Sequence, residues 1–164
     1  MISRYCLLAL ATGLQCAPAW ATLHSPAAGN TGAKDSPLYP FGYGLSYTDF
    51  SLSEITLSSR QLKVDQTLYA SIAVKNTGAR DGETVVQLYL QDVSASVSRP
   101  VKELNGFKKI MLKAGEERTV RFAVSKHDLK FYNARLHYAA EPGEFNLQIG
   151  LDSQNVKQQR FEWQ

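Results

Sequence analysis

Residues 68–76 read LYASIAVKN, and this stretch decides the fold class. Leu68, Ala70, Ile72 and Val74 share one face of an extended chain, and the residues between them lie on the other face. Successive side chains of a strand point to opposite sides of a sheet, so strict alternation is typical of a half-buried strand. The stretch therefore predicts a β-strand with one face in a hydrophobic core.

Three other segments, 84–91, 119–124 and 144–151, show the same alternation. Four such segments in one short chain favour an all-β protein. The side chains predicted to point inward in these three segments are Val86, Leu88 and Leu90, then Val120, Phe122 and Val124, then Phe145, Leu147, Ile149 and Leu151.

Weaker strands complete the prediction. Segment 102–112 is expected to contain a bulge, either at Gly106 or at the Lys108-Lys109 pair, and residues 125–129 predict one short helical turn. The predicted fold is an immunoglobulin- or fibronectin type III-like β-sandwich of about seven strands with Greek-key links. The weaker strands are 51–57, 102–112, 136–140 and 157–163, the last as an edge strand.

Length and charge exclude several classes of protein. The chain has 164 residues, whereas a (β/α)8 barrel needs about 250. The 18 basic and 15 acidic residues are interspersed and give a net charge of +3. Because no block of lysine or arginine occurs, we expect no nucleic-acid partner. The mild group of Arg99, Lys102, Lys108 and Lys109 is interpreted as outward-facing charge that protects an edge strand.

Residues 1–21 have the three-part pattern of a secretory signal peptide. Arg4 precedes an uncharged apolar run over residues 5–14, and Ala19-Trp20-Ala21 supplies the small residues that a signal peptidase recognises. A membrane anchor is disfavoured, because a span needs about 20 apolar residues. We therefore expect an exported protein, periplasmic or secreted, that is free of the membrane after cleavage. Both cysteines, Cys6 and Cys16, would leave with the signal, so no disulfide is expected.

Residues 22–50 are predicted to be a linker followed by an aromatic docking strip, and residues 51–164 to be the folded domain. Tyr39, Phe41, Tyr43 and Tyr47 are separated by glycine and proline, so they cannot all be buried within one extended segment. Exposed apolar patches of this kind usually mark an interaction site. Three interpretations stay open: docking against another domain or subunit, packing on the sandwich's own side, and a platform on which sugars stack.

The chemistry-bearing residues do not form a catalytic pattern. The carboxylates fall mostly in predicted turns or on outward strand positions, and His24, His127 and His137 are scattered. No pair of histidines has metal-ligand spacing, and neither a nucleophile elbow nor a phosphate-binding loop occurs. We therefore expect no catalytic residue, no metal site and no cofactor.

Four motifs in order carry a family resemblance: PLYPFGYGLSYTDF (37–50), KNTGARDGETVVQLYLQD (75–92), SRPVKELNGFKKIML (98–112) and AEPGEFNLQIGLDS (140–153). Together they resemble the C-terminal fibronectin type III-like domain of family 3 glycoside hydrolases, as in bacterial periplasmic β-glucosidases. In that family the catalytic carboxylates lie on a barrel domain and on an α/β domain. The resemblance thus implies a β-sandwich that is not itself catalytic.

The resemblance also implies a role for the aromatic strip. It is similar to the segment that leaves the α/β domain, and Arg99-Pro100-Val101 resembles a loop beside the same interface. The implied function is an accessory domain that stabilises or positions catalytic domains of a β-glucosidase, or the remnant of a truncated enzyme, with those domains or another subunit as partner. The alternative is a stand-alone exported carbohydrate-binding module. The implied docking residues are Tyr39, Phe41, Tyr43, Tyr47 and Arg99.

Overall fold

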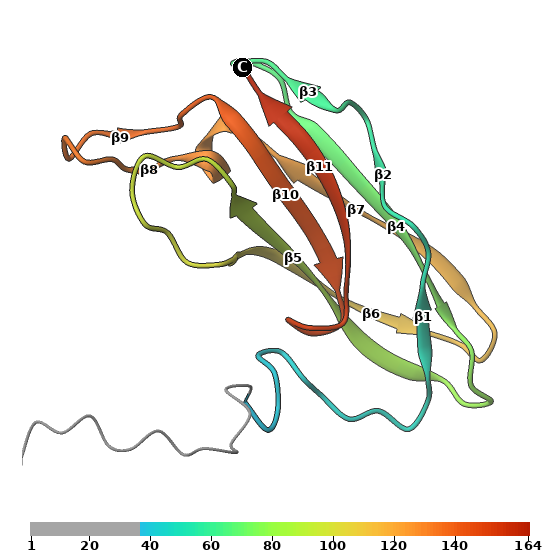
Figure 1. The fold of residues 1–164 in the computed structure, drawn as a ribbon. Helices are drawn as coiled ribbons and strands as arrows, with labels where there is room; N and C mark the ends of the chain where they lie inside the picture. The colour runs from blue at the N-terminus through green and yellow to red at the C-terminus, as the bar shows by residue number, and fades with distance from the viewer. Residues whose placement is uncertain (1–36) are drawn as a thin grey trace, which may run out of the picture. The chain divides into compact units, whose positions relative to one another are not determined.

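The computed structural model describes residues 37–164, which form two facing β-sheets (Figure 1). The predicted signal peptide, 1–21, and the linker up to residue 36 lie outside the described residues. The first sheet is built around β4 (Leu68–Asn76), which pairs antiparallel with β7 (Glu117–Val124) on one side. On its other side β4 pairs with β1 (Phe50–Leu52) and then with β2 (Thr56–Leu57).

The second sheet has the order β3-β11-β10-β5-β6. Its neighbours are antiparallel, except that β3 runs parallel to β11. The bounds are β3 (Gln61–Leu62), β5 (Gly82–Asp92), β6 (Glu103–Leu112), β10 (Gly143–Gly150) and β11 (Val156–Trp163).

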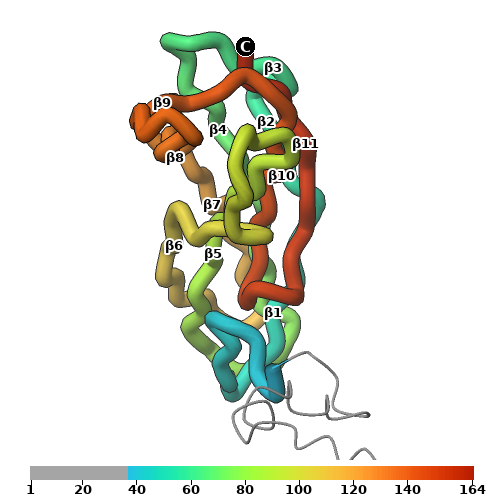
Figure 2. The backbone as a smooth tube through the Cα atoms, turned by 60° about the vertical axis from the view of Figure 1, so that its left-hand side comes forward, coloured from blue at the N-terminus to red at the C-terminus, as the bar shows by residue number. Residues whose placement is uncertain are grey.

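A small hairpin of β8 (Phe131–Tyr132) and β9 (Tyr138–Ala139) follows a 3-10 turn over Lys126–Leu129. It projects to one side of the two sheets in both views (Figures 1 and 2). Asp128 stabilises the 3-10 turn by accepting a hydrogen bond from the Ser125 N–H over 2.7 Å. The predicted single helical turn at 125–129 is therefore confirmed.

The core lies between the two sheets, and the predicted inward faces of the strands supply it. Leu68, Ala70, Ile72 and Val74 of β4 are all buried, as are the predicted residues of β7. The predicted residues of β5 and β10 are also buried, and Leu151 lies just after β10 and is partly exposed. Among the long strands the chain crosses between the sheets after β4, after β6 and after β7, which is the connectivity of a Greek-key sandwich.

Three details differ from the prediction. Segment 51–57 is not one strand, because the chain leaves the ladder after Leu52 and Ile55 turns into the core. The bulge in β6 lies at Asn105, beside Gly106, so the Lys108-Lys109 alternative is wrong. β11 is an edge strand along most of its length, but β3 pairs with its last two residues. If the interrupted β1–β2 is counted as one strand, it and the six long strands make the predicted seven.

The outer face of β5 and β10 is also largely buried, which the alternation did not predict. Gln87 and Tyr89 on β5 and Asn146 and Gln148 on β10 are all buried. These are the central strands of the sheet, and the loop between β5 and β6 folds back over their outer face (Figure 2). Each of these side chains makes a hydrogen bond: Tyr89 donates to Gln87, and Gln87 donates to the Leu151 carbonyl. Asn146 donates to Gln91, and Gln148 donates to Gln158.

Candidate functional site

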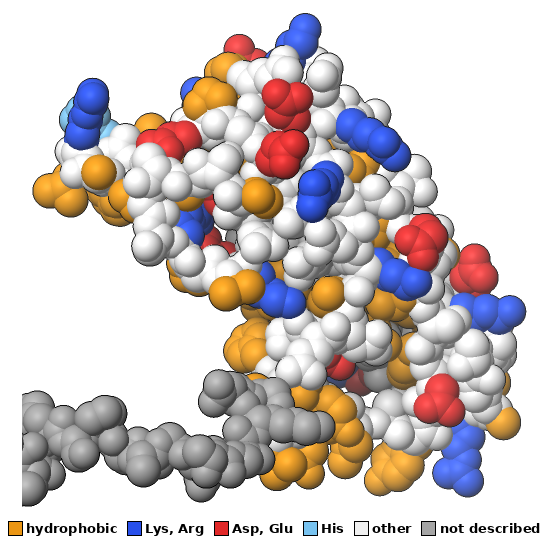
Figure 3. Space-filling model, in the orientation of Figure 1, with side chains coloured by type: hydrophobic (Ala, Val, Ile, Leu, Met, Phe, Trp, Pro, Cys, Tyr) orange, Lys and Arg blue, Asp and Glu red, His pale blue; other side chains and the backbone are white. Residues whose placement is uncertain are grey.

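The aromatic strip, residues 37–47, exposes most of its rings. Tyr39 and Phe41 are each 65% exposed and Tyr47 is 92% exposed, whereas Tyr43 is less exposed than these three. The rings of Tyr39 and Tyr43 contact each other, with centroids 5.2 Å apart. Figure 3 shows hydrophobic side chains gathered at the lower end of the molecule. The four predicted docking aromatics thus present apolar surface to the outside.

The backbone of the strip, by contrast, is attached to the sandwich. Gly42 has a φ of +78°, and the Tyr43 N–H donates to the Pro40 carbonyl over 3.1 Å, which closes a tight turn. The Ser153 N–H donates to the Phe41 carbonyl over 2.9 Å, and Gln87 Nε2 donates to the Gly42 carbonyl over 3.1 Å. The strip is therefore held in place while its rings remain free.

Gln87 connects the strip to the sheet. Its Nε2 also donates to the Leu151 carbonyl over 2.8 Å, and its Oε1 accepts from the Tyr89 hydroxyl over 2.5 Å. Burial raises the pKa of Tyr89, and the nearby Asp152 carboxylate raises it further. The Tyr89 hydroxyl consequently stays protonated and keeps donating to Gln87.

A second attachment lies where the strip enters β1. Asn76 is fully buried, and its Oδ1 accepts from the Thr48 hydroxyl over 2.6 Å and from the Gly78 N–H over 3.1 Å. Its Nδ2 donates to the carbonyls of Arg80 and Leu112 over 2.7 and 3.2 Å. One buried amide thus joins Thr48, just after the strip, to the turn between β4 and β5.

A pocket of about 330 Å3 lies beside the strip. Residues 42–45 of the strip contribute one part of its lining, and β5 and the loop after β10 contribute the rest. Asp152 accepts backbone hydrogen bonds from Gln154 and Asn155, each over 2.7 Å. The polar side chains that line the pocket are Glu83, Thr84, Asp152 and Asn155.

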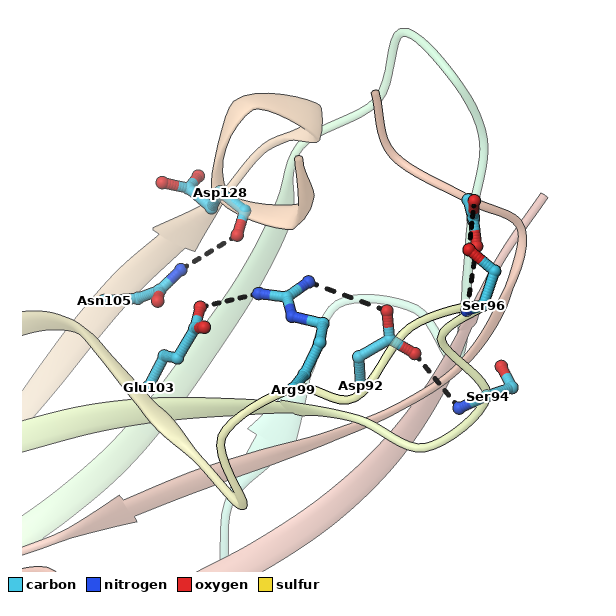
Figure 4. Close-up of polar contacts among 8 residues, drawn as sticks. Asp92, Ser94, Ser96, Arg99, Glu103, Asn105 and Asp128 are labelled. Atoms are coloured by element: carbon cyan, nitrogen blue, oxygen red, sulfur yellow. Dashed lines mark hydrogen bonds and ion pairs between the residues drawn. The ribbon is translucent and has the colours of Figure 1, made fainter. Parts of the chain in front are cut away.

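Arg99, the fifth predicted docking residue, lies in a separate cluster (Figure 4). Its Nη2 is 2.6 Å from Glu103 Oε2, and its Nη1 is 3.7 Å from Asp92 Oδ2. The guanidinium carbon also lies 4.5 Å from the centre of the Phe131 ring. Within the described residues these contacts involve the β5–β6 loop and its surroundings, and none involves the aromatic strip.

Asp92 is the buried anion of this cluster. Burial raises its pKa, although the Ser94 N–H bond and the Arg99 charge both act to lower it. Asp92 Oδ2 has no hydrogen-bond partner among the described residues, so Arg99 is the cation that faces it. Through these contacts, Arg99 holds the β5–β6 loop against β5, β6 and β8.

The remaining chemistry-bearing side chains stay dispersed. In the part of the chain that the structure describes, no three His, Cys, Asp or Glu side chains come close enough together to hold a metal ion. No helix within residues 37–164 is long and apolar enough to cross a membrane. His24, one of the three histidines considered above, lies outside this part.

Sequence reasoning missed the residues that hold the strip, namely Gln87, Ser153 and Asn76. Asn76 carried a signal, since it is a polar residue at an inward position of an otherwise apolar face. Gln87 carried none, because alternation assigns it to an outer face that normally meets water.

The sequence of this chain is similar to those of known proteins. Residues 84–153 match the fibronectin type III-like domain family. The chain is 58% identical to a periplasmic beta-glucosidase of Salmonella typhimurium over 128 residues, which are 78% of this chain and 17% of the relative. It is 43% identical to a putative beta-xylosidase of Formosa agariphila over 129 residues, which are 79% of this chain and 17% of that protein.

Solved structures show the same similarity. The beta-glucosidase of Listeria innocua in complex with glucose superposes with a TM-score of 0.76 at 41% identity, over 80% of this chain and 18% of that one. A beta-glucosidase of Erythrobacter marinus superposes with a TM-score of 0.77 at 39% identity, over 81% of this chain and 18% of that one. The chain thus spans less than a fifth of the length of these relatives.

Proposed function

Because residues 84–153 form a fibronectin type III-like domain homologous to the C-terminal part of family 3 β-glucosidases, we propose that this chain is an accessory domain without catalytic residues of its own. Its role is to stabilise or position the catalytic domains of such an enzyme, whether they belong to the same polypeptide or to another. It acts outside the cytoplasm, in keeping with the periplasmic relative and with the signal pattern of residues 1–21.

The observation that carries the proposal is the strip itself, because its rings are exposed while its backbone is fixed. The four rings expose roughly 500 Å2 of apolar surface. Burial of that area would release about 12 kcal/mol at roughly 25 cal/mol per Å2, against an association cost of about 4–15 kcal/mol. The hydrogen bonds from Gln87 and Ser153 have already ordered the strip, so less of that cost falls on the docking step.

The test uses the catalytic domains of a family 3 β-glucosidase that lack their own C-terminal domain. Addition of the full chain is expected to give saturable binding by calorimetry and to raise the melting temperature of those domains by several degrees. The double variant Phe41→Ser/Tyr47→Ser should abolish both effects. Tyr132→Ser is the matched control, because Tyr132 is an exposed aromatic on the distant β8–β9 hairpin.

Two results would overturn the proposal. The first is a wild-type chain that neither binds nor stabilises the catalytic domains. The second is release of the aglycone from an aryl β-glucoside by the purified chain alone, which would make it an enzyme.

The pocket beside the strip favours a second candidate function, a carbohydrate-binding module. The pocket has a volume of about 330 Å3, and Tyr43, Asp152 and Asn155 are among its lining residues, so it can offer an aromatic residue and hydrogen-bonding groups to a sugar. Titration with cello-oligosaccharides, followed by calorimetry, distinguishes the two functions. Saturable millimolar or tighter binding that Tyr43→Ser abolishes and Tyr132→Ser preserves would favour the module.

A further inference from the structure

Three exposed apolar side chains lie on the outer face of β6, outside the aromatic strip. Phe107 is 67% exposed, Met111 is 54% exposed and Leu104 is 41% exposed. β6 is the edge strand of the second sheet, and β5 is its neighbour. The geometry points to this face, Leu104, Phe107 and Met111, as a continuation of the surface that docks the catalytic domains; the inference rests on the proposed function.

The strand register places this face next to the strip. Phe107 is the Cα partner of Gln87, and the Gln87 side chain donates to the Gly42 carbonyl of the strip. Only Gln87 therefore lies between Phe107 and the strip. Leu104 is the partner of Tyr89, and Met111 is the partner of Glu83. The three apolar side chains therefore follow β6 beside the strip, with the exposed Lys109–Glu83 ion pair between Phe107 and Met111.

The bulge at Asn105 is what places Leu104 on the same face as Phe107. Residues 104 and 107 differ by an odd number, so in a regular strand they would point to opposite sides of the sheet. The extra residue shifts the register between Leu88 and Tyr89. Leu104 and Phe107 consequently both face outward, on the same side of the sheet as their cross-strand partners Tyr89 and Gln87.

The area agrees with a single interface. The four strip rings and the three β6 side chains together expose roughly 800 Å2. One partner of a standard-size interface buries about the same area, and monomers seldom expose contiguous apolar patches much above 600 Å2.

The β6 side chains dock through their face rather than through the strand edge. Lys109 lies between Phe107 and Met111 and forms an ion pair with Glu83 of β5. Lys108 extends toward the Phe122 ring on the other side of the sheet, with its Nζ 5.6 Å from the ring centre. Lysines on an edge strand oppose the addition of another strand. The lysines thus oppose a second copy of this chain paired along β6, and the occupant we infer is the catalytic part of the enzyme, because the face adjoins the strip that is proposed to dock it.

The experiment repeats the calorimetric titration with the full-length double variant Phe107→Ser/Met111→Ser. Affinity for the catalytic domains should fall about tenfold to a hundredfold, as expected when central apolar contacts are lost. Tyr69→Ser is the matched control, since Tyr69 is an exposed aromatic on β4 in the other sheet, and it should stay within twofold of wild type. Circular dichroism and the urea midpoint check that each variant folds. Leu104→Lys, which places a charge on the same face, should weaken binding as well.

The outcomes separate the two proposals. If the wild-type chain does not bind, the proposed function fails. If it binds and Phe41→Ser/Tyr47→Ser abolishes binding while the β6 variants bind like wild type, only the extension to β6 is overturned. A wild-type chain that sediments as a dimer, and becomes a monomer on Phe107→Ser/Met111→Ser, would also overturn it.

Discussion

Gly42 is the residue on which the position of the aromatic strip depends. Its φ of +78° lies in the left-handed region that favours glycine, and an added Cβ would clash with the Gln87 side chain. Gly44, two residues on, has nothing within 4 Å of an added Cβ. The sequence shows two similar glycines, and only one of them is required by the fold.

Gly42→Ala should therefore detach the strip without unfolding the sandwich. We expect the unfolding free energy to fall by about 1–2 kcal/mol, through backbone strain and the loss of the Gln87 contact. The Ser153 amide, which donates to the Phe41 carbonyl, should lose hydrogen-exchange protection. Gly44→Ala is the control and should leave the unfolding free energy and the Ser153 amide protection unchanged. Equal amide protection in the two variants would contradict the role assigned to Gly42.

Asn76 is the second decisive residue, because its amide makes four hydrogen bonds in a fully buried site. Asn76→Ala leaves several of those partners unsatisfied and should cost about 2–4 kcal/mol of unfolding free energy in urea titrations. Asn133→Ala removes instead a partly exposed turn asparagine, whose Oδ1 accepts from the N–H groups of Arg135 and His137, and should cost less than about 1 kcal/mol. Similar losses in both variants would show that the buried network adds little.

At the scale of elements, the β5–β6 loop is closed by charge as well as by packing. Arg99 contacts Glu103, Asp92 and the Phe131 ring, which belong to β6, β5 and β8. Ser96, from the same loop, binds Glu141 with its hydroxyl and its N–H over 2.8 and 3.1 Å. The loop that covers the second sheet is thus tied down at two points.

Arg99→Met is predicted to destabilise the fold in a pH-dependent way. At pH 7 it should lower the unfolding free energy by about 2–4 kcal/mol, because Asp92 loses the cation that faces it and Phe131 its cation–π contact. The raised pKa of Asp92 means that its carboxyl protonates more readily in the folded state than in the unfolded one. The part of the stability that this raised pKa contributes is present at acid pH and is lost as the pH rises through it.

The loss caused by Arg99→Met should consequently shrink as the pH falls through the raised pKa of Asp92, because a neutral carboxyl needs no cation. Urea midpoints between pH 3 and pH 7 measure this. Lys109→Met is the control, since its pair with Glu83 is exposed, and it should change stability by less than about 1 kcal/mol at any pH. A penalty for Arg99→Met that is independent of pH would show that only packing is lost.

At the scale of the whole molecule, the C-terminal strand completes the core. β11 pairs with β10 over eight residues, and Phe161 and Trp163 are buried. The Phe145 and Phe161 rings stack with centroids 5.5 Å apart. With no cysteine in residues 37–164, this packing must hold the sandwich without a disulfide.

Trp163→Ala should thus cost about 3–5 kcal/mol, a large part of the stability of a domain this size. Thermal unfolding followed by circular dichroism measures the loss. Glu162→Ala, an exposed neighbour on the same strand, should stay close to wild type. A small effect of Trp163→Ala would show that β11 is a peripheral strand.

The alternation in the sequence by itself determined the class of fold, the long strands and their inward residues, because side-chain parity is a local property of extended backbone. Local chemistry likewise predicted an interaction site at the aromatics of residues 39–47. Only the tertiary structure decided that Gln87 is buried, that Arg99 is occupied within its own loop, and that Leu104 and Phe107 face outward together. Those outcomes depend on a bulge and on contacts between distant residues, such as the bonds from Gln87 to carbonyls 45 and 64 positions away. No periodicity records such contacts, because they arise only when the strands have been placed side by side.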